Sequence, residues 1–384
     1  MTASHPNTKR PALYKATMSE TEKILRYCHE CGVCCEQCEF LKQTGGTPKK
    51  LAEGFQAGDF HHTPHVPYSC NLCDLCEELC PERLNIGRMC LEARRQLIQN
   101  GIAPLPPHIY IKRELEWVTS DSFSLSLPHP SATTCERVFF PGCSLSGYSP
   151  SLVIKVYNYL LERLPNTGII LGCCGAPARE LGDQSAFNQM LHKLKSTMRT
   201  MEVLEIILAC PNCYYNLRQY ASEFHSTSLY QAIMEVGLPH GTTQRRWTFS
   251  LHDPCKARWE QSLQQSVRAL IRKMGYTIEE MEYSQHKTRC CGSGGTVFYV
   301  DFDLSKRIVR KRTEEASFDL LTYCSTCRET LAREKPTLHV LDLIFNPNWT
   351  KDRLRPPHKA STRRQNQALL KSLLANKREN LSLP

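Results

Sequence analysis

The chain has 384 residues, of which 41% are hydrophobic and 22% charged. These values are ordinary for a folded protein and exclude a collagen, a coiled coil and a wholly disordered chain. The formal net charge is +10, but residues 351–384 alone hold nine basic and two acidic side chains. Because the rest of the chain is nearly balanced, the charge does not indicate nucleic-acid binding, and we expect no nucleic-acid partner.

Cysteine is the unusual part of the composition, with 21 residues. No stretch approaches the roughly 18 apolar residues of a membrane span, and the first residues lack the apolar core of a signal peptide. We therefore expect a cytoplasmic protein in a reducing compartment. There, clustered cysteines bind metal or carry out redox chemistry more often than they form disulfides.

The chain divides into regions of different character. Residues 21–100 contain ten of the cysteines, end in a predicted helix over 89–100, and are expected to form a small helical domain. Residues 101–134 are rich in proline and serine and are expected to be a linker with one helix over 109–118. Residues 135–345 alternate predicted strands and helices, which indicates an α/β region with parallel sheets.

Two runs of four cysteines have the spacing of a ferredoxin that holds two clusters. In such runs a tight loop presents three thiolates to one iron–sulfur cubane, and the fourth cysteine reaches the other cluster. Each run has the spacing Cys-x2-Cys-x2-Cys-x3-Cys, and Pro81 follows the second. One [4Fe-4S] cluster is thereby assigned to Cys28, Cys31, Cys34 and Cys80, and the other to Cys70, Cys73, Cys76 and Cys38.

The first run departs from this pattern in two places. Glu39 stands where a proline is expected after Cys38, and Cys35 adds a thiol next to a predicted ligand. Either change could alter which residue of the first run ligates. Zinc, which also binds paired Cys-x2-Cys motifs, is the alternative metal.

The region after the linker contains an internal repeat. Five cysteines recur in the same order in residues 135–240 and 241–345, with corresponding residues 112, 117 and 114 positions apart. We expect each copy to be a repeated parallel βαβ unit with its cysteines at the carboxyl ends of strands, where sites collect in such sheets. The predicted strands cover residues 137–140, 168–171, 205–208, 247–251, 276–281 and 319–322.

The repeated motifs resemble the cysteine-rich CCG domain family. They read ProGlyCys143, GlyCysCysGly175 and CysProAsnCys213 in the first copy, and HisAspProCys255, CysCysGlySerGlyGly295 and CysSerThrCys327 in the second. The family includes the B-type and D-type subunits of heterodisulfide reductase and the iron–sulfur subunits of anaerobic glycerol-3-phosphate and glycolate oxidoreductases. The order of a two-cluster ferredoxin domain before two CCG copies looks most like the D-type subunit.

This resemblance implies one or two non-cubane [4Fe-4S] clusters in the CCG copies. Both cysteine sets are complete, which favours two filled sites. By match, one cluster would take Cys143, Cys173, Cys174, Cys210 and Cys213, and the other Cys255, Cys290, Cys291, Cys324 and Cys327.

Residues beside these motifs allow more than one interpretation. The glycines of 291–295 favour backbone N–H groups directed at cluster sulfurs, with a phosphate cradle as the weaker alternative. His252 and Asp253 fit either a proton-transfer role or a cap at the end of a strand. Cys90 and Cys135 lie outside every motif and are expected to be ordinary thiols.

The last region, residues 346–384, is expected to be a basic tail. It contains an amphipathic helix with Leu369, Leu370, Leu373 and Leu374 on one face. Such a helix either contacts an anionic membrane surface or a partner, or is simply solvated.

The expected function is that of an iron–sulfur electron-transfer oxidoreductase subunit. Electrons would pass from two cubanes to the CCG sites, where a disulfide or another two-electron acceptor reacts. The catalytic residues, the substrate and the direction of electron flow are not specified by the sequence. The alternative is a non-catalytic relay of a flavin-linked 2-hydroxy-acid or glycerol-3-phosphate dehydrogenase that feeds a membrane quinone pool. A zinc scaffold is a third interpretation.

Either redox role requires a partner subunit. We expect a flavoprotein or a membrane cytochrome or quinone-reactive subunit. The chain would then be cytoplasmic, with contact at the inner face of the membrane through the basic tail.

Overall fold

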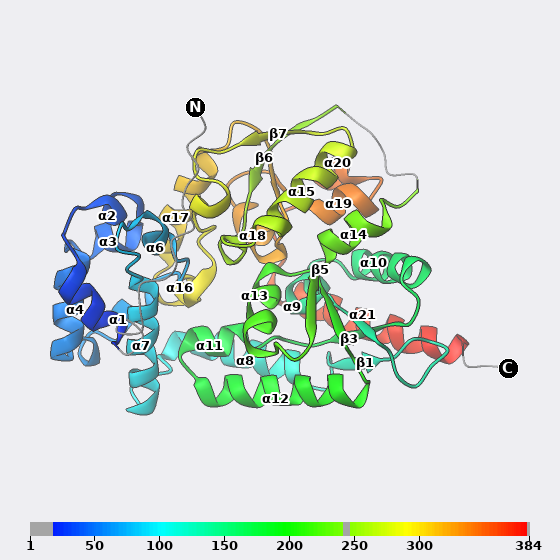
Figure 1. The fold of residues 1–384 in the computed structure, drawn as a ribbon, viewed down its shortest axis with the longest axis horizontal. Coiled ribbons are helices and arrows are strands. Elements are labelled where there is room, and N and C mark those ends of the chain that lie inside the picture. Colours follow the sequence, from blue (N-terminus) through cyan, green and yellow to red (C-terminus); the bar gives the residue numbers. More distant parts are fainter. Residues whose placement is uncertain (1–17, 241–245, 382–384) are drawn as a thin grey trace.

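The structure, a computed structural model, describes residues 18–240 and 246–381. It combines an all-helical N-terminal domain with an α/β region that contains two sheets (Figure 1). The start of the chain, on which the expectation about a signal peptide depends, lies outside the described residues. None of the described helices is long and apolar enough to cross a membrane.

The N-terminal domain is built from short helices because its cysteine loops interrupt the chain every few residues. Ser19 caps the first helix through a capping box with Glu22, and Thr47 caps the fourth, which starts with Pro48. The helices are α1 (Glu20–Tyr27), α2 (Val33–Gln37), α3 (Glu39–Gln43), α4 (Pro48–Ala57), η2 (Asp59–His61), α5 (His65–Tyr68), α6 (Leu75–Leu79) and α7 (Ile86–Gln99).

The segment expected to be a linker is part of the folded body. It contains η3 (Pro106–His108), α8 (Ile109–Thr119) and β1 (Leu125–Leu127). β1 pairs antiparallel with β3 and so forms one edge of the first sheet. The proline-rich composition predicted the breaks between these elements but not the strand, because only pairing with β3 makes three residues extended here.

The first sheet has the strand order β1-β3-β2-β4-β5, and every pair except β1 with β3 is parallel. The strands β2, β3 and β4 are buried almost throughout, as expected for a parallel sheet covered on both faces. The elements are β2 (Arg137–Phe140), α9 (Gly142–Tyr148), α10 (Pro150–Arg163), β3 (Thr167–Leu171), α11 (Ala176–Leu181), α12 (Gln184–Thr200), β4 (Glu205–Leu208), α13 (Pro211–Tyr220), β5 (His225–Ser228) and α14 (Leu229–Val236).

The second sheet is entirely parallel and has the order β7-β6-β8-β9. Taken in chain order, this is the order β3-β2-β4-β5 of the first sheet. The elements are β6 (Thr248–His252), η4 (Cys255–Ala257), α15 (Gln261–Lys273), β7 (Thr277–Glu280), η5 (Gln285–Lys287), η6 (Gly294–Thr296), α16 (Val297–Val300), α17 (Phe302–Glu314), β8 (Leu320–Thr322), α18 (Ser325–Leu331), β9 (Thr337–His339) and α19 (Val340–Phe345).

The C-terminal segment forms α20 (Trp349–Asp352) and α21 (Ala360–Leu381). α21, red in Figure 1, packs against α9 and α10 of the first α/β unit. Leu370 and Leu374 are fully buried there, whereas Leu369 and Leu373 are 51% and 42% exposed. The apolar face of the predicted tail helix is therefore divided between the protein core and the surface.

Candidate iron–sulfur sites

The first ferredoxin group gathers around Cys34, at the start of α2. Burial raises the pKa of the Cys34 thiol, and the neighbouring thiols of Cys35, Cys80 and Cys28 raise it further. Cys31 lies close to Cys28 and is exposed. The structure thus brings Cys80 of the second run into the group of the first, while Cys35 contacts Cys34 from the side.

The second ferredoxin group contains Cys38, which comes from the first run. Burial raises the pKa of the Cys38 thiol to about 12, and the thiols of Cys73 and Cys70 contribute. Cys76 has the other three thiols of this group as neighbours. Left-handed backbone at Leu72 and Asp74 turns the loop so that its cysteines face one cavity, whose volume is about 60 Å³ and whose lining includes Cys38, Cys70, Cys73 and Cys76.

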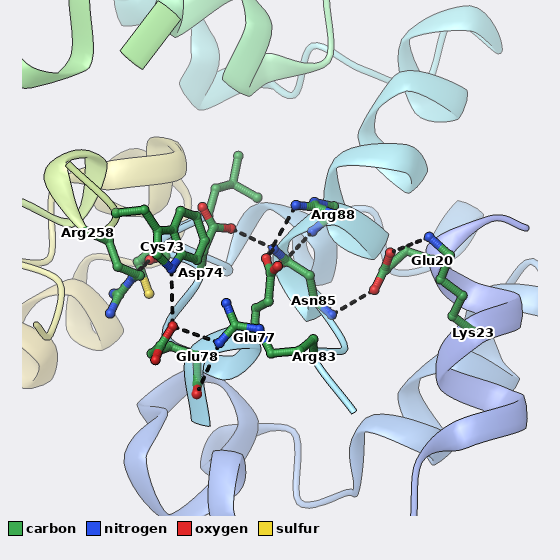
Figure 2. A network of polar contacts seen from close by, with 12 residues as sticks. Glu20, Lys23, Cys73, Asp74, Glu77, Glu78, Arg83, Asn85, Arg88 and Arg258 are labelled. Carbon is green, nitrogen blue, oxygen red and sulfur yellow. Dashed lines mark hydrogen bonds and ion pairs between the residues drawn. The ribbon is translucent and has the colours of Figure 1, made fainter. Parts of the chain in front are cut away.

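A polar network holds this loop in place (Figure 2). The side-chain amide of Asn85 donates to Glu77 at 2.7 Å and to Asp74 at 3.0 Å. Its backbone N–H donates to the buried Glu20 of α1 at 2.8 Å. The network joins α1, the cysteine loop, α6 and the start of α7, so the position of Cys73 and Cys76 depends on contacts far apart in the sequence.

The ten motif cysteines of the α/β region, which leave out Cys135, form one continuous series of neighbouring sulfurs. In the first unit, Cys173 contacts Cys143 and Cys174, and Cys213 contacts Cys174 and Cys210. In the second unit, the same relationships join the corresponding residues. The series runs Cys143, Cys173, Cys174, Cys213, Cys210, Cys324, Cys327, Cys291, Cys290, Cys255.

The two halves of the series meet at Cys210 and Cys324, whose thiols are neighbours. Both residues directly precede a helix, α13 or α18, and follow a central strand of their sheet. One cavity of about 230 Å³ is lined by all ten cysteines. The carboxyl ends of two separate sheets therefore face one shared space.

These donor sets fit iron–sulfur clusters. The groups consist of soft sulfur donors that lie next to one another, and all of them except the exposed Cys31 are buried or partly buried. Burial raises the pKa of Cys73 to about 12, and the neighbouring Cys255 contributes next. A cationic metal core removes the cost of burying thiolates together, because it binds them in place of the thiol protons. Hard oxygen-binding metals such as magnesium and calcium do not suit such a set.

The helical domain is in direct contact with the second α/β unit at its cysteines. Arg258 donates to the carbonyl of Cys73 at 2.9 Å, and Lys256 donates to that of Leu72 at 2.6 Å. Cys290 also lines the cavity of the second ferredoxin group. Sequence reasoning missed Lys256 and Arg258, because nothing in a local pattern shows that two domains meet there.

The glycine-rich stretch after Cys291 serves two purposes. The N–H of Gly292 donates to the sulfur of Cys290 at 3.3 Å, as Gly175 does to Cys173 at 3.5 Å. A Cβ on Gly294 would lie 2.6 Å from the carbonyl oxygen of Asn71. The first glycine thus supplies an N–H to sulfur, as favoured by the sequence, and Gly294 lets the ferredoxin loop approach closely.

Asp253, which the sequence left open between two roles, is part of a buried polar network. Arg268 donates to its two carboxylate oxygens at 2.9 and 2.7 Å, and Tyr323 donates at 2.8 Å. Arg268 holds the pKa of this carboxyl below its usual range despite the burial. Asp253 therefore fixes the loop after β6, and its oxygens are engaged in this network instead of in proton transfer.

The two thiols outside the motifs are both buried. Cys90 on α7 is a direct neighbour of the Cys70 thiol and raises its pKa. Cys135 packs in the core of the first unit, where a Cβ on Gly168 would lie 2.7 Å from its sulfur. Cys90 thus lies beside a predicted ligand, a relationship that the sequence did not indicate.

Comparison with protein families agrees with this division of the chain. The 4Fe-4S dicluster domain matches residues 27–85. The cysteine-rich domain CCG matches twice, at residues 137–218 and 249–332. The chain therefore contains a 4Fe-4S dicluster domain followed by two copies of the cysteine-rich domain.

Its relatives are distant in sequence and differ in how much of their length the chain covers. An iron–sulfur protein of Methanocaldococcus jannaschii, named as uncharacterized, is 24% identical over 82% of this chain and 70% of its own length. A probable membrane-anchored ferredoxin of Chromohalobacter salexigens is 22% identical over 79% of this chain, which spans only 56% of that relative. The D-type subunit of the dihydromethanophenazine:CoB–CoM heterodisulfide reductase of Methanosarcina barkeri is 21% identical over 81% of this chain and 89% of its own length.

Proposed function

We propose that this iron–sulfur electron-transfer subunit holds four clusters and reduces or oxidises a two-electron substrate between its two α/β units. The cubane sets would be Cys28, Cys31, Cys34 and Cys80, and Cys70, Cys73, Cys76 and Cys38. The non-cubane sets would be Cys143, Cys173, Cys174, Cys210 and Cys213, and Cys255, Cys290, Cys291, Cys324 and Cys327. When bound, such clusters supply transfer of single electrons at potentials that the protein tunes.

The order of the four sets in space supports this proposal. The set around Cys34 contains the exposed Cys31 and would therefore be accessible to a partner. The set with Cys73 adjoins Cys255 of the second unit, and that unit adjoins the first through Cys324 and Cys210. The sites therefore form a continuous path from the surface to the shared cavity. We infer that the two α/β units are repeats of one βαβ arrangement that present equivalent sites to this cavity.

The shared cavity is the observation that supports a substrate reaction at this site. A relay requires only that its sites lie in sequence, whereas here ten cysteines surround a space that also has a polar lining from Asn212 and Thr326. Arg363 of α21 lines it as well and forms no ion pair within the described residues. A disulfide that takes up two electrons and two protons becomes two thiols, and both units could supply electrons to it.

The test compares disulfide reduction by the anaerobically purified holoprotein with that by Cys327→Ala. A reduced viologen dye supplies the electrons, and Cys135→Ala is the matched control because its thiol lies in the core of the first unit. We expect the wild-type protein to oxidise the dye when a disulfide such as oxidised glutathione or a smaller aromatic disulfide is added. Cys327→Ala should lose this reaction, and Cys135→Ala should keep it. Equal rates in all three proteins, or no reaction with any disulfide, would refute the substrate chemistry.

The second candidate function is a relay without its own substrate. The relative named a probable membrane-anchored ferredoxin favours it, and so do the exposed Leu369 and Leu373 beside the basic residues of α21. In this case a flavoprotein partner would supply the electrons, and a membrane quinone pool would accept them. A flavoprotein that copurifies, together with no reaction towards disulfides, would favour the relay.

A further inference from the structure

His252 occupies a special place at the second set of cysteines. It is the last residue of β6 and is completely buried. One of its ring nitrogens lies within 4.8 Å of the sulfurs of Cys291 and Cys327, close enough for all three residues to share one metal ion. His252 could thus be either an additional iron ligand or a hydrogen-bond donor to a sulfur ligand.

The partner of the other ring nitrogen decides between these roles. Nδ1 of His252 lies 2.9 Å from Nε of Arg312. A guanidinium has only donors, so Nδ1 must be the acceptor, and the proton of a neutral imidazole then resides on Nε2. A protonated nitrogen has no lone pair for a metal. The arrangement therefore excludes Nε2 as a ligand and makes it an N–H donor.

Arg312 is itself held rigidly, which fixes this tautomer. Its side chain is fully buried, and Nη1 donates to the carbonyl of Tyr283 at 2.8 Å. It also forms an ion pair with Glu315. Nε2 of His252 is buried and forms no hydrogen bond within the described residues. The sulfurs of Cys291 and Cys327, which lie within 4.8 Å of the His252 ring, are the acceptors that a small adjustment around a bound cluster would bring into reach.

The first unit places a different donor at the equivalent cysteine. Asn216, on α13 and 1% exposed, donates its amide to the sulfur of Cys174 at 3.7 Å. Cys174 is the second cysteine of its pair, as Cys291 is of the other. The position that corresponds to His252, the last residue of the first strand of the unit, is the buried Phe140, which cannot donate. Each unit thus directs one N–H at the same cysteine, from a different element.

We propose that His252 is a positioning residue that donates a fixed hydrogen bond from Nε2 to Cys291 and thereby raises the reduction potential of the second CCG site. A donor stabilises the extra negative charge that a reduced cluster places on its sulfur ligands. Asn216 has the same effect on the first site through Cys174. This inference rests on the proposed function, since it requires a cluster on the second set.

The experiment compares His252→Phe, His252→Gln and Phe140→Leu in the anaerobically purified protein. The readouts are iron content and redox titration followed by electron paramagnetic resonance. In His252→Phe we expect full iron content and a signal that is at least tenfold harder to reduce, which is 59 mV for a one-electron couple. His252→Gln keeps an N–H donor and should therefore retain most of the wild-type reduction potential. Phe140→Leu should leave the reduction potential of both sites unchanged.

Three outcomes would overturn the inference. Loss of iron in both His252 variants, with Phe140→Leu unaffected, would make His252 a ligand. Full iron content with an unchanged potential in His252→Phe would mean that the hydrogen bond does not tune the site. A wild-type protein with about eight irons per chain, two cubanes of four, would refute the proposed function and this inference together, whereas the first two outcomes leave the proposed function intact.

Discussion

Cys210, two residues after β4, is the direct neighbour of Cys324, two residues after β8, although the two residues follow strands of different sheets. This contact joins the two cysteine sets into one series. The two sites are consequently neighbours that can affect each other. Cys143 and Cys255 stand at the two ends of the series, with the other eight cysteines between them.

This relationship predicts a difference between two variants of the second set. Cys324→Ala and Cys255→Ala should each lower the iron content by about four per chain, the content of one [4Fe-4S] cluster. Because the side chain of Cys324 lies next to Cys210 of the first set, Cys324→Ala should change the paramagnetic signal of the first site more than Cys255→Ala does. Identical first-site spectra in both variants would show that the two sets do not interact.

The exchange of the fourth cysteine between the ferredoxin runs predicts which cluster is lost. Cys38→Ser should remove the cluster of Cys70, Cys73 and Cys76, because Cys38 lies in that group. Cys35→Ser should keep the full iron content, since Cys35 lies beside Cys34 and is not one of the four cysteines assigned to that cluster. Iron analysis with spectroscopy of the reduced protein checks both. A loss of iron in Cys35→Ser with none in Cys38→Ser would assign the ligand to Cys35.

The close approach of the ferredoxin loop to the second unit predicts a large cost at Gly295. A Cβ there would overlap the carbonyl oxygen of Cys70, and φ is +62°. Gly101 has a similar φ of +70° and nothing within 4 Å. Gly101→Ala should lower the free energy of unfolding by about 1 kcal/mol through its backbone alone. Gly295→Ala should cost about 1–3 kcal/mol more through overpacking.

Denaturant unfolding of both glycine variants measures these differences. Gly295→Ala should also slow the reduction of the CCG sites relative to the ferredoxin clusters, because it separates the two domains. Equal stability losses in the two variants would contradict the close approach.

His108 predicts a pH dependence of stability that is independent of the cysteines. Burial, assisted by Arg94, lowers its pKa to about 4 from an ordinary 6.5. Its Nδ1 accepts from the N–H of Leu105 at 3.1 Å, and its ring packs on Tyr68. Above pH 6.5 the residue is neutral in both states. Below it, the unfolded chain takes up a proton that the folded chain does not, so stability falls until about pH 4.

The full loss amounts to about 3 kcal/mol, of which the part above pH 5.5 can be measured without acid damage to clusters. His108→Gln keeps an acceptor for Leu105 and removes the titration. We expect unfolding free energies that decline from pH 7.5 to 5.5 more steeply in the wild type than in His108→Gln. Parallel curves would contradict the lowered pKa.

The sequence predicted those parts of the structure that depend on residues close together. The cysteine runs and the buried strands β2 and β4 are local patterns, and residues 137–140 and 205–208 were expected as strands with these bounds. The edge strands β5 and β9 were missed. β5 reads His-Ser-Thr-Ser, which has no apolar alternation, and it is extended only because it pairs with β4.

The remaining features arise from packing between distant segments. The paired leucines of α21 could not show which of them is buried, because that depends on how the helix lies on α9. Likewise, nothing near His252 in the sequence indicates that Arg312, sixty residues later, fixes its tautomer. Ligand types were thus readable from spacing, while the groups that tune and connect the sites required the structure.

The central claim is that the two α/β units hold clusters in addition to the two cubanes. The most direct test is iron and sulfide analysis of the anaerobically purified protein, with electron paramagnetic resonance of the oxidised state before and after addition of a thiol. We expect about sixteen irons per chain, four for each of four clusters, and an oxidised-state signal that changes when a thiol is added. About eight irons and signals from reduced cubanes alone would contradict it.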